Sequence, residues 1–119
     1  MSTSQKTILV VHPDQEKREY VLEILQQNDN LHVEVAPTPE IARSILERIR
    51  VSVLLTAIFP DREGLDLLEH VAQKYTTLVP VACLPSGDQD AVIRALNAGA
   101  QYYINTPFQP EEIHLIAQR

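Results

Sequence analysis

Several acidic and histidine side chains lie near the ends of apolar runs, where they could take part in chemistry. Asp61, Glu63 and Asp66 follow the apolar run 51–55 and could act as paired carboxylates. However, Asp61 and Glu63 stand in a turn before Gly64, and Asp66 stands at the start of a helical pattern. Solvated acids are common at a helix start because they interact favourably with the helix dipole. We therefore favour a turn and a helix start over a catalytic pair.

Two further candidates follow the first apolar run, 7–11. His12 could sense pH or bind a transition metal. Its three fellow histidines are scattered along the sequence, which disfavours a metal cluster; they are His32, His70 and His114. Asp14 could be a metal ligand, but an aspartate directly before a helix accepts backbone N–H bonds. We favour a helix N-cap for Asp14 and a structural role for His12.

Composition narrows the classes of partner. Cys83 is the single cysteine, which excludes an intramolecular disulfide and a cysteine-based zinc site. It lies in an apolar run, so we favour an inert core thiol over a reactive one. The net charge of −6 disfavours direct binding to nucleic acid or anionic membranes. No apolar run approaches the roughly 18 residues that span a bilayer, and the polar N-terminus is no signal peptide. We expect a cytoplasmic protein.

Two periodicities alternate along the chain and predict its fold class. Short apolar or alternating runs predict strands at 7–11, 32–36, 51–55, 78–84 and 101–105. Between them, apolar residues at i, i+3, i+4 and i+7 predict helices. These stripes are Ala42, Ile45, Leu46 and Ile49; Leu68, Val71, Ala72 and Tyr75; and Val92, Ala95, Leu96 and Gly99. Strict alternation predicts an α/β fold, a doubly wound five-stranded parallel sheet in three αβα layers.

Local signals predict where the helices begin and end. Asp14, Thr38 and Asp88 are candidate N-caps, and Pro39 suits the first helical position after Thr38. Gly99 suits the left-handed end of the fourth helix, and a first helix is expected within 14–27. A last helix is expected from about residue 110. We read residues 1–119 as one domain and favour a longer parent protein over a complete chain.

Five segments, in order and at the right spacing, carry a resemblance to a known family. They are residues 8–11, 51–68, 80–81, 95–100 and 103–108. Over essentially its whole length the chain resembles the response-regulator receiver domain, the CheY-like family with a flavodoxin-like (βα)5 fold. The second segment, 51–68, matches without a gap the stretch around the position where that family carries its phosphoacceptor.

The resemblance implies a phosphorylation site whose chemistry has been lost. In the family, an aspartate after strand three accepts a phosphoryl group, and it binds Mg²⁺ together with an acidic pair after strand one. A Ser or Thr after strand four and a Lys after strand five contact the phosphoryl oxygens. The matched positions hold Thr56 (acceptor), His12 and Pro13 (acidic pair), Pro85 (hydroxyl) and Thr106 (lysine). Ser86 could shift into the hydroxyl position. Thr56 cannot form an acyl phosphate, and Mg²⁺ requires hard oxygen ligands, so we expect no metal and no cofactor.

The resemblance also assigns roles outside this pocket. Tyr103 matches an aromatic residue that changes rotamer in active receivers, and we favour a fixed Tyr103 over a switch driven by partner binding. The bond before Pro107 matches one that is cis in the family. Helix four, strand five and helix five form the usual docking and dimer surface, which is either an interface or simply solvated here. Its outward residues would be Arg94, Asn97, Gln101, Tyr102, Gln109, Glu111 and Glu112.

Three functional hypotheses follow. The leading one is a pseudo-receiver, not an enzyme, that signals through protein–protein interaction without aspartate phosphorylation. A second is the regulatory or dimerising head of a transcription or RNA-binding regulator. A third is a flavodoxin-like small-ligand binder, which is weakened because none of the three glycines follows the first strand.

Overall fold

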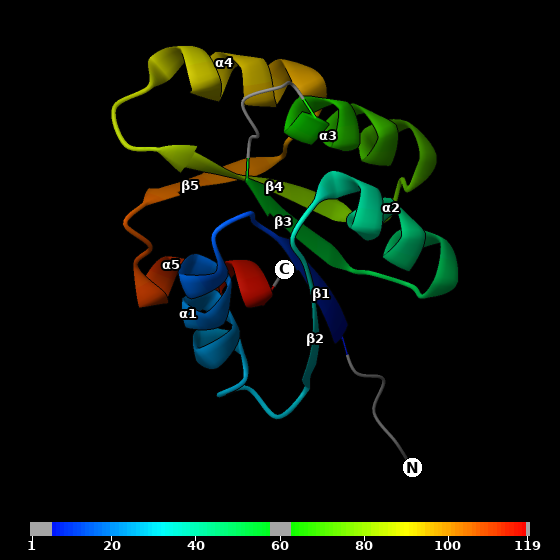
Figure 1. Ribbon diagram of the computed structural model, residues 1–119, viewed down its shortest axis with the longest axis vertical. Coiled ribbons are helices and arrows are strands. Elements are labelled where there is room, and N and C mark those ends of the chain that lie inside the picture. The colour runs from blue at the N-terminus through cyan, green and yellow to red at the C-terminus, as the bar shows by residue number, and fades with distance from the viewer. Residues whose placement is uncertain (1–5, 58–62, 119) are drawn as a thin grey trace.

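The computed structural model describes residues 6–57 and 63–118, in which strands and helices alternate strictly (Figure 1). The strands are β1 (Lys6–Val11), β2 (Leu31–Ala36), β3 (Val53–Ala57), β4 (Val79–Pro85) and β5 (Tyr102–Thr106). The helices are α1 (Gln15–Leu25), α2 (Pro39–Arg48), α3 (Glu63–Lys74), α4 (Gln89–Ala98) and α5 (Pro110–Ala117). None of the described helices is long and apolar enough to cross a membrane.

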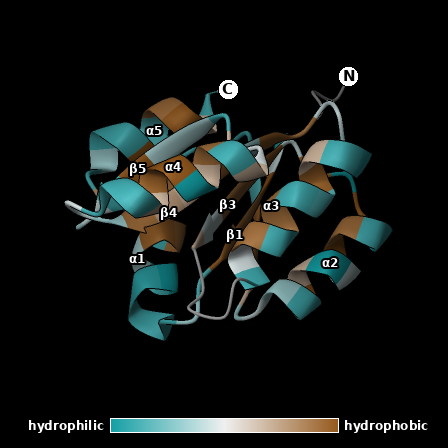
Figure 2. Cartoon of the chain, turned by 90° about the horizontal axis from the view of Figure 1, so that it is seen from above, coloured by the Kyte–Doolittle hydropathy of each residue, from teal (hydrophilic) through white to brown (hydrophobic). Residues whose placement is uncertain are grey.

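The sheet is parallel with the order β2-β1-β3-β4-β5, so the strand order reverses next to β1. Helices α1 and α5 cover one face, and α2, α3 and α4 cover the other (Figure 1). The strand side chains alternate between the two layers: Ile8 and Val10 pack in the α1/α5 core, and Leu9 and Val11 pack beneath α2 and α3. Figure 2 shows hydrophobic residues on the strands and polar residues on outer helix faces. The predicted doubly wound three-layer fold is confirmed.

The three predicted N-cap residues each form their capping hydrogen bond. The side chain of Asp14 accepts hydrogen bonds from the backbone of Glu16 and Lys17 at the start of α1. Thr38 caps α2, with proline at the next position, and the Asp88 side chain accepts from the backbone N–H of Ala91 in α4. Side chains of these types satisfy N–H groups that have no partner inside the helix. The predictions for Asp14, Thr38 and Asp88 are confirmed.

Four details of the predicted elements are wrong. Strand β3 spans Val53–Ala57, two residues later than the predicted run, because Thr56 and Ala57 still pair with β4. Leu96 is 46% exposed, since α4 packs through Ala91, Ala95 and Ala98. Ala72, in the predicted stripe of α3, is also exposed. Ile49 is the extended C-cap of α2 and is 37% exposed, so the α2 stripe ends one turn earlier.

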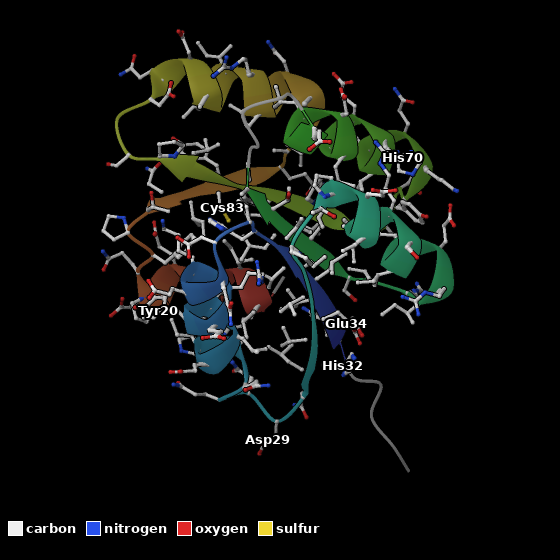
Figure 3. The ribbon with its side chains drawn as sticks, viewed as in Figure 1. Tyr20, Asp29, His32, Glu34, His70 and Cys83 are labelled. Carbon is white, nitrogen blue, oxygen red and sulfur yellow. The ribbon has the colours of Figure 1, made fainter. Side chains whose placement is uncertain are left out.

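Cys83 lies in the middle of β4 and is buried, as predicted (Figure 3). Burial raises the pKa of its thiol far above the ordinary value, because a thiolate is poorly solvated in an apolar core. The thiol therefore stays protonated in the folded domain and behaves as a small core residue.

Candidate functional site

The residues that sequence analysis singled out converge on one edge of the sheet, at the carboxyl ends of the strands. His12 follows β1 directly, and Thr56 of β3 stands beside Val11 of β1 in the ladder. On the other side Thr56 pairs with Ala82 of β4. At the far end of the same edge Pro85 pairs with Thr106 of β5. In open parallel sheets this edge, next to the reversal of strand order, is where ligand sites form.

Thr56 occupies the centre of this edge and is completely buried, with 0% of its surface exposed. Its hydroxyl donates a hydrogen bond to the carbonyl oxygen of Ala57 at 3.0 Å. Among the described residues Thr56 is the one buried polar or charged side chain, and none of their buried polar side-chain atoms lacks a partner. The centre of the edge is therefore neutral, and its hydroxyl is already satisfied.

His12 is half-buried and held by three contacts. Its Nδ1 accepts a hydrogen bond from the backbone N–H of Asp14 at 3.0 Å. Its carbonyl oxygen accepts one from the guanidinium of Arg18 at 2.6 Å. The imidazole meets the ring of Phe108 edge-on, with centroids 6.2 Å apart and planes at 80°. The hydrogen bond to Nδ1 and the contact with Phe108 orient the ring.

Electrostatics keep this imidazole neutral. Burial lowers the pKa of His12 below the ordinary 6.5, because the charged form loses hydration. Lys17 lowers it further, Asp14 opposes this, and Arg18 adds to the lowering. A nitrogen that accepts from an N–H must carry a free lone pair, so the neutral ring has its proton on Nε2.

The remaining positions that the family resemblance matched lie at the surface of the same edge. Pro13, Pro85 and Ser86 are exposed, and Thr106 is partly exposed. Asp14 is engaged as the N-cap of α1 and as an ion-pair partner of Lys17 at 3.3 Å. The hydrogen bond from Lys17 lowers the pKa of the Asp14 carboxyl. Glu63 and Asp66 both lie in the first turn of α3 and are exposed, whereas Asp61 lies outside the described residues.

The model of the response regulator receiver domain family matches residues 8–118 of this chain. The chain belongs to the receiver domain family. The phosphate regulon transcriptional regulatory protein PhoB of Escherichia coli is 30% identical over 110 residues, which are 91% of this chain and 48% of PhoB. The chain thus spans about half the length of this relative.

Solved structures agree with the family assignment. A putative response regulator from Chloroflexus aurantiacus is 27% identical, with a TM-score of 0.85 over 98% of this chain and 100% of that one. The signal receiver domain of an HD domain-containing protein from Pseudomonas fluorescens has a TM-score of 0.89 over 99% of this chain and 88% of that one. At 20% identity the second likeness shows the fold alone.

The residues at this receiver's edge do not fit the divalent cation that the family resemblance implies. Mg²⁺ binds through carboxylates and other hard oxygens. Here the matched positions offer a bonded hydroxyl, an imidazole and a proline. Within residues 6–57 and 63–118, no group of three His, Cys, Asp or Glu side chains could hold a metal ion. His32 lies on β2 beside Glu34, far along the chain from His70 on α3 (Figure 3).

The proline prediction is confirmed, and the switch prediction stays open. The peptide bond between Thr106 and Pro107 is cis. Tyr103 on β5 is 42% exposed and pairs in the ladder with Ala82. The position of its usual hydroxyl partner holds Pro85, which has no donor.

The α4–β5–α5 face of the receiver, formed by residues 89–98, 102–106 and 110–117, carries more apolar surface than the sequence indicated. All seven residues predicted for it, from Arg94 to Glu112, are exposed. Sequence reasoning missed Ile93 and Leu115, which are 56% and 61% exposed. The signal that could have found Ile93 is the alanine stripe of α4, because a helix that packs through alanines turns its larger apolar residues outward.

Proposed function

We propose that this receiver is a pseudo-receiver, a signalling domain that acts through protein–protein interaction without aspartate phosphorylation. The observation that carries the proposal is Thr56, a fully buried neutral residue at the position of the phosphoacceptor. Its hydroxyl is fully buried and donates to a backbone carbonyl, so it is not exposed to a phosphodonor in solution. A threonine hydroxyl is also a far weaker nucleophile than a carboxylate at neutral pH.

The other matched positions support the same proposal. Phosphoryl transfer depends on cations that neutralise charge on the transferred group. Thr106 brings no charge where the family has its lysine, and His12 and Pro13 bring no carboxylate for a metal. The family's carboxylates and its lysine are replaced together at these positions. No unpaired buried charge is left behind, and such a charge would be strongly destabilising.

Phosphodonors are expected to leave the protein unmodified. With acetyl phosphate and Mg²⁺, intact-mass spectrometry should show no added phosphoryl group, and beryllofluoride with Mg²⁺ should leave the amide chemical shifts of Thr56 and its neighbours unchanged. A receiver that retains aspartate at the acceptor position serves as the positive control under the same conditions. Stoichiometric phosphorylation, or a Mg²⁺-dependent shift at Thr56, would contradict the proposal.

We also propose that the α4–β5–α5 face associates with a second copy of this domain. Ile93 and Leu96 lie one helical turn apart on α4, and the exposed Tyr102 and Tyr103 follow on β5. Tyrosine is enriched at interface centres, and exposed apolar patches rimmed by polar residues mark interaction sites.

Ile93→Glu is expected to weaken self-association at least about tenfold, because it places a charge in an apolar contact. Sedimentation velocity over a range of protein concentrations measures the dissociation constant. Ile41→Glu is the matched control, since Ile41 is 43% exposed on α2, outside this face. Equal weakening by both variants, or a wild-type protein that stays monomeric at all concentrations, would count against this surface.

A second candidate function is the regulatory head of a transcription or RNA-binding regulator. The observation that favours it is the likeness to PhoB, a transcriptional regulatory protein of which the match covers 48%. Reading the gene beyond the codon for Arg119 tests it: a DNA- or RNA-binding segment in the same reading frame supports it, and a stop codon removes it.

A further inference from the structure

His12 connects two loops that are distant in sequence. Its ring accepts a hydrogen bond from the backbone N–H of Asp14, the N-cap of α1. The ring also contacts Phe108, which lies in the loop between β5 and α5. Phe108 is itself buried, with 7% of its surface exposed, and packs in the core shared by α1 and α5. A movement of this one imidazole therefore reaches the start of α1 and the β5–α5 loop together.

The hydrogen bond to Asp14 exists in only one protonation state of the ring. Neutral His12 presents a lone pair on Nδ1 to the Asp14 N–H, whereas an imidazolium carries hydrogens on both nitrogens. Two N–H donors would then face each other over 3.0 Å. Because the ring also forms the edge contact with Phe108, a rotation that relieves the first clash changes the second contact.

The charged groups around His12 oppose protonation on balance. The charged groups that shift the pKa of His12 all come from the start of α1: Lys17 and Arg18 are cations, and Asp14 is the single anion. The β5–α5 loop contributes the apolar ring of Phe108. Strand β2 contributes the carbonyl of Ala36, which accepts a hydrogen bond from the backbone N–H of His12. Desolvation acts in the same direction as the two cations and lowers the pKa of His12, so protonation belongs to the range below pH 6.5.

We propose that His12 is a proton-operated switch, in which protonation of Nδ1 breaks the bond to Asp14 and shifts the contact with Phe108. Acidification then loosens the first turn of α1 and the loop between β5 and α5. This loop borders the α4–β5–α5 face. Protonation at the position where the family binds its metal therefore affects the proposed docking surface. The switch stands on the contacts of His12 alone; that it replaces phosphorylation as the regulatory input rests on the proposed function.

Nuclear magnetic resonance titration of the full chain from pH 7.5 to 5.0, without Mg²⁺ or phosphodonor, tests the switch. The amide of Asp14, the ring of Phe108 and the imidazole of His12 should shift together, with one midpoint below 6.5. Asp14 does not confuse the reading, because the pKa of its carboxyl lies below the ordinary 3.8. The carboxylate thus stays ionised throughout the titration.

Two variants separate the outcomes. In His12→Asn an amide oxygen can take the place of Nδ1 but cannot be protonated in this range, so the shifts at Asp14 and Phe108 should disappear. In a triple variant, His32, His70 and His114 each become Asn, and the titration should persist because His12 remains.

The proposal is overturned if His12 titrates while Asp14 and Phe108 stay unchanged, or if His12→Asn keeps their pH dependence. Should His12→Asn fail to fold, the triple variant decides alone. None of these readings involves phosphorylation, so failure of the switch leaves the pseudo-receiver proposal standing, and the reverse also holds.

Discussion

Replacing Thr56 by aspartate is expected to destabilise the domain by about 3–5 kcal/mol at pH 7, although it restores the residue that the family uses. Thr56 is fully buried between β1 and β4. A carboxylate there has no metal ligands beside it and no lysine at position 106. A buried ion without a partner loses its hydration and gains nothing in return. The measurement is urea unfolding, whose linear extrapolation gives the free energy.

The pH dependence of this variant identifies the charge as the cause. Burial raises the pKa of the introduced carboxyl above its unfolded value of about 3.9. The folded state therefore holds its proton more tightly than the unfolded state, so the penalty grows as the pH rises above the unfolded pKa and levels off above the folded pKa. Thr56→Asn is the matched neutral control and should show no such dependence. If Mg²⁺ restores the stability of Thr56→Asp, the edge retains a cation site and the proposed loss of metal binding is wrong.

Much of the fold could be predicted because each local signal agreed with the global pattern. Asp14, Thr38 and Asp88 each precede a helix, and their side chains accept hydrogen bonds from the first N–H groups of that helix. The local signal and the global fold therefore agree. Strand β3 ends two residues later than the predicted run, because the apolar pattern stops before Thr56. The place of Thr56 and Ala57 in the sheet comes from pairing with β4, which a local pattern does not contain.

The position of the candidate site could be located from sequence, but its internal contacts could not. Spacing along five segments was enough to align Thr56, Pro85 and Thr106 with one edge of the sheet. The ring contact between His12 and Phe108 spans almost the whole chain and depends on how β1 and β5 are placed in the sheet. Likewise, Leu96 points outward because α4 packs through the face that carries its alanines. In the sequence, those alanines are the one signal for this orientation.

The close approach of α3 and α4 depends on one glycine. Gly99 ends α4 with φ +115°, a left-handed conformation that residues with a Cβ avoid. A Cβ placed there would lie 2.6 Å from the Cβ of Ala72 on α3, too close for either atom to remain in position. Gly99→Ala therefore combines backbone strain with a steric overlap between two helices.

We expect Gly99→Ala to lower the free energy of unfolding by about 2–5 kcal/mol, from roughly 1–2 for the left-handed backbone and about 1–3 for overpacking. Gly87→Ala is the matched control, since Gly87 has φ +85° but its Cβ would meet nothing within 4 Å. It should therefore lose only the backbone contribution. Adding Ala72→Gly to Gly99→Ala removes the overlapping atom, and a double-mutant cycle then isolates the overlap from the helix propensity lost at position 72. Equal losses for Gly99→Ala and Gly87→Ala, with no coupling to Ala72, would show that α4 can move away from α3. The outward face of α4, with Ile93 and Leu96, would then be held less firmly than the proposed docking surface requires.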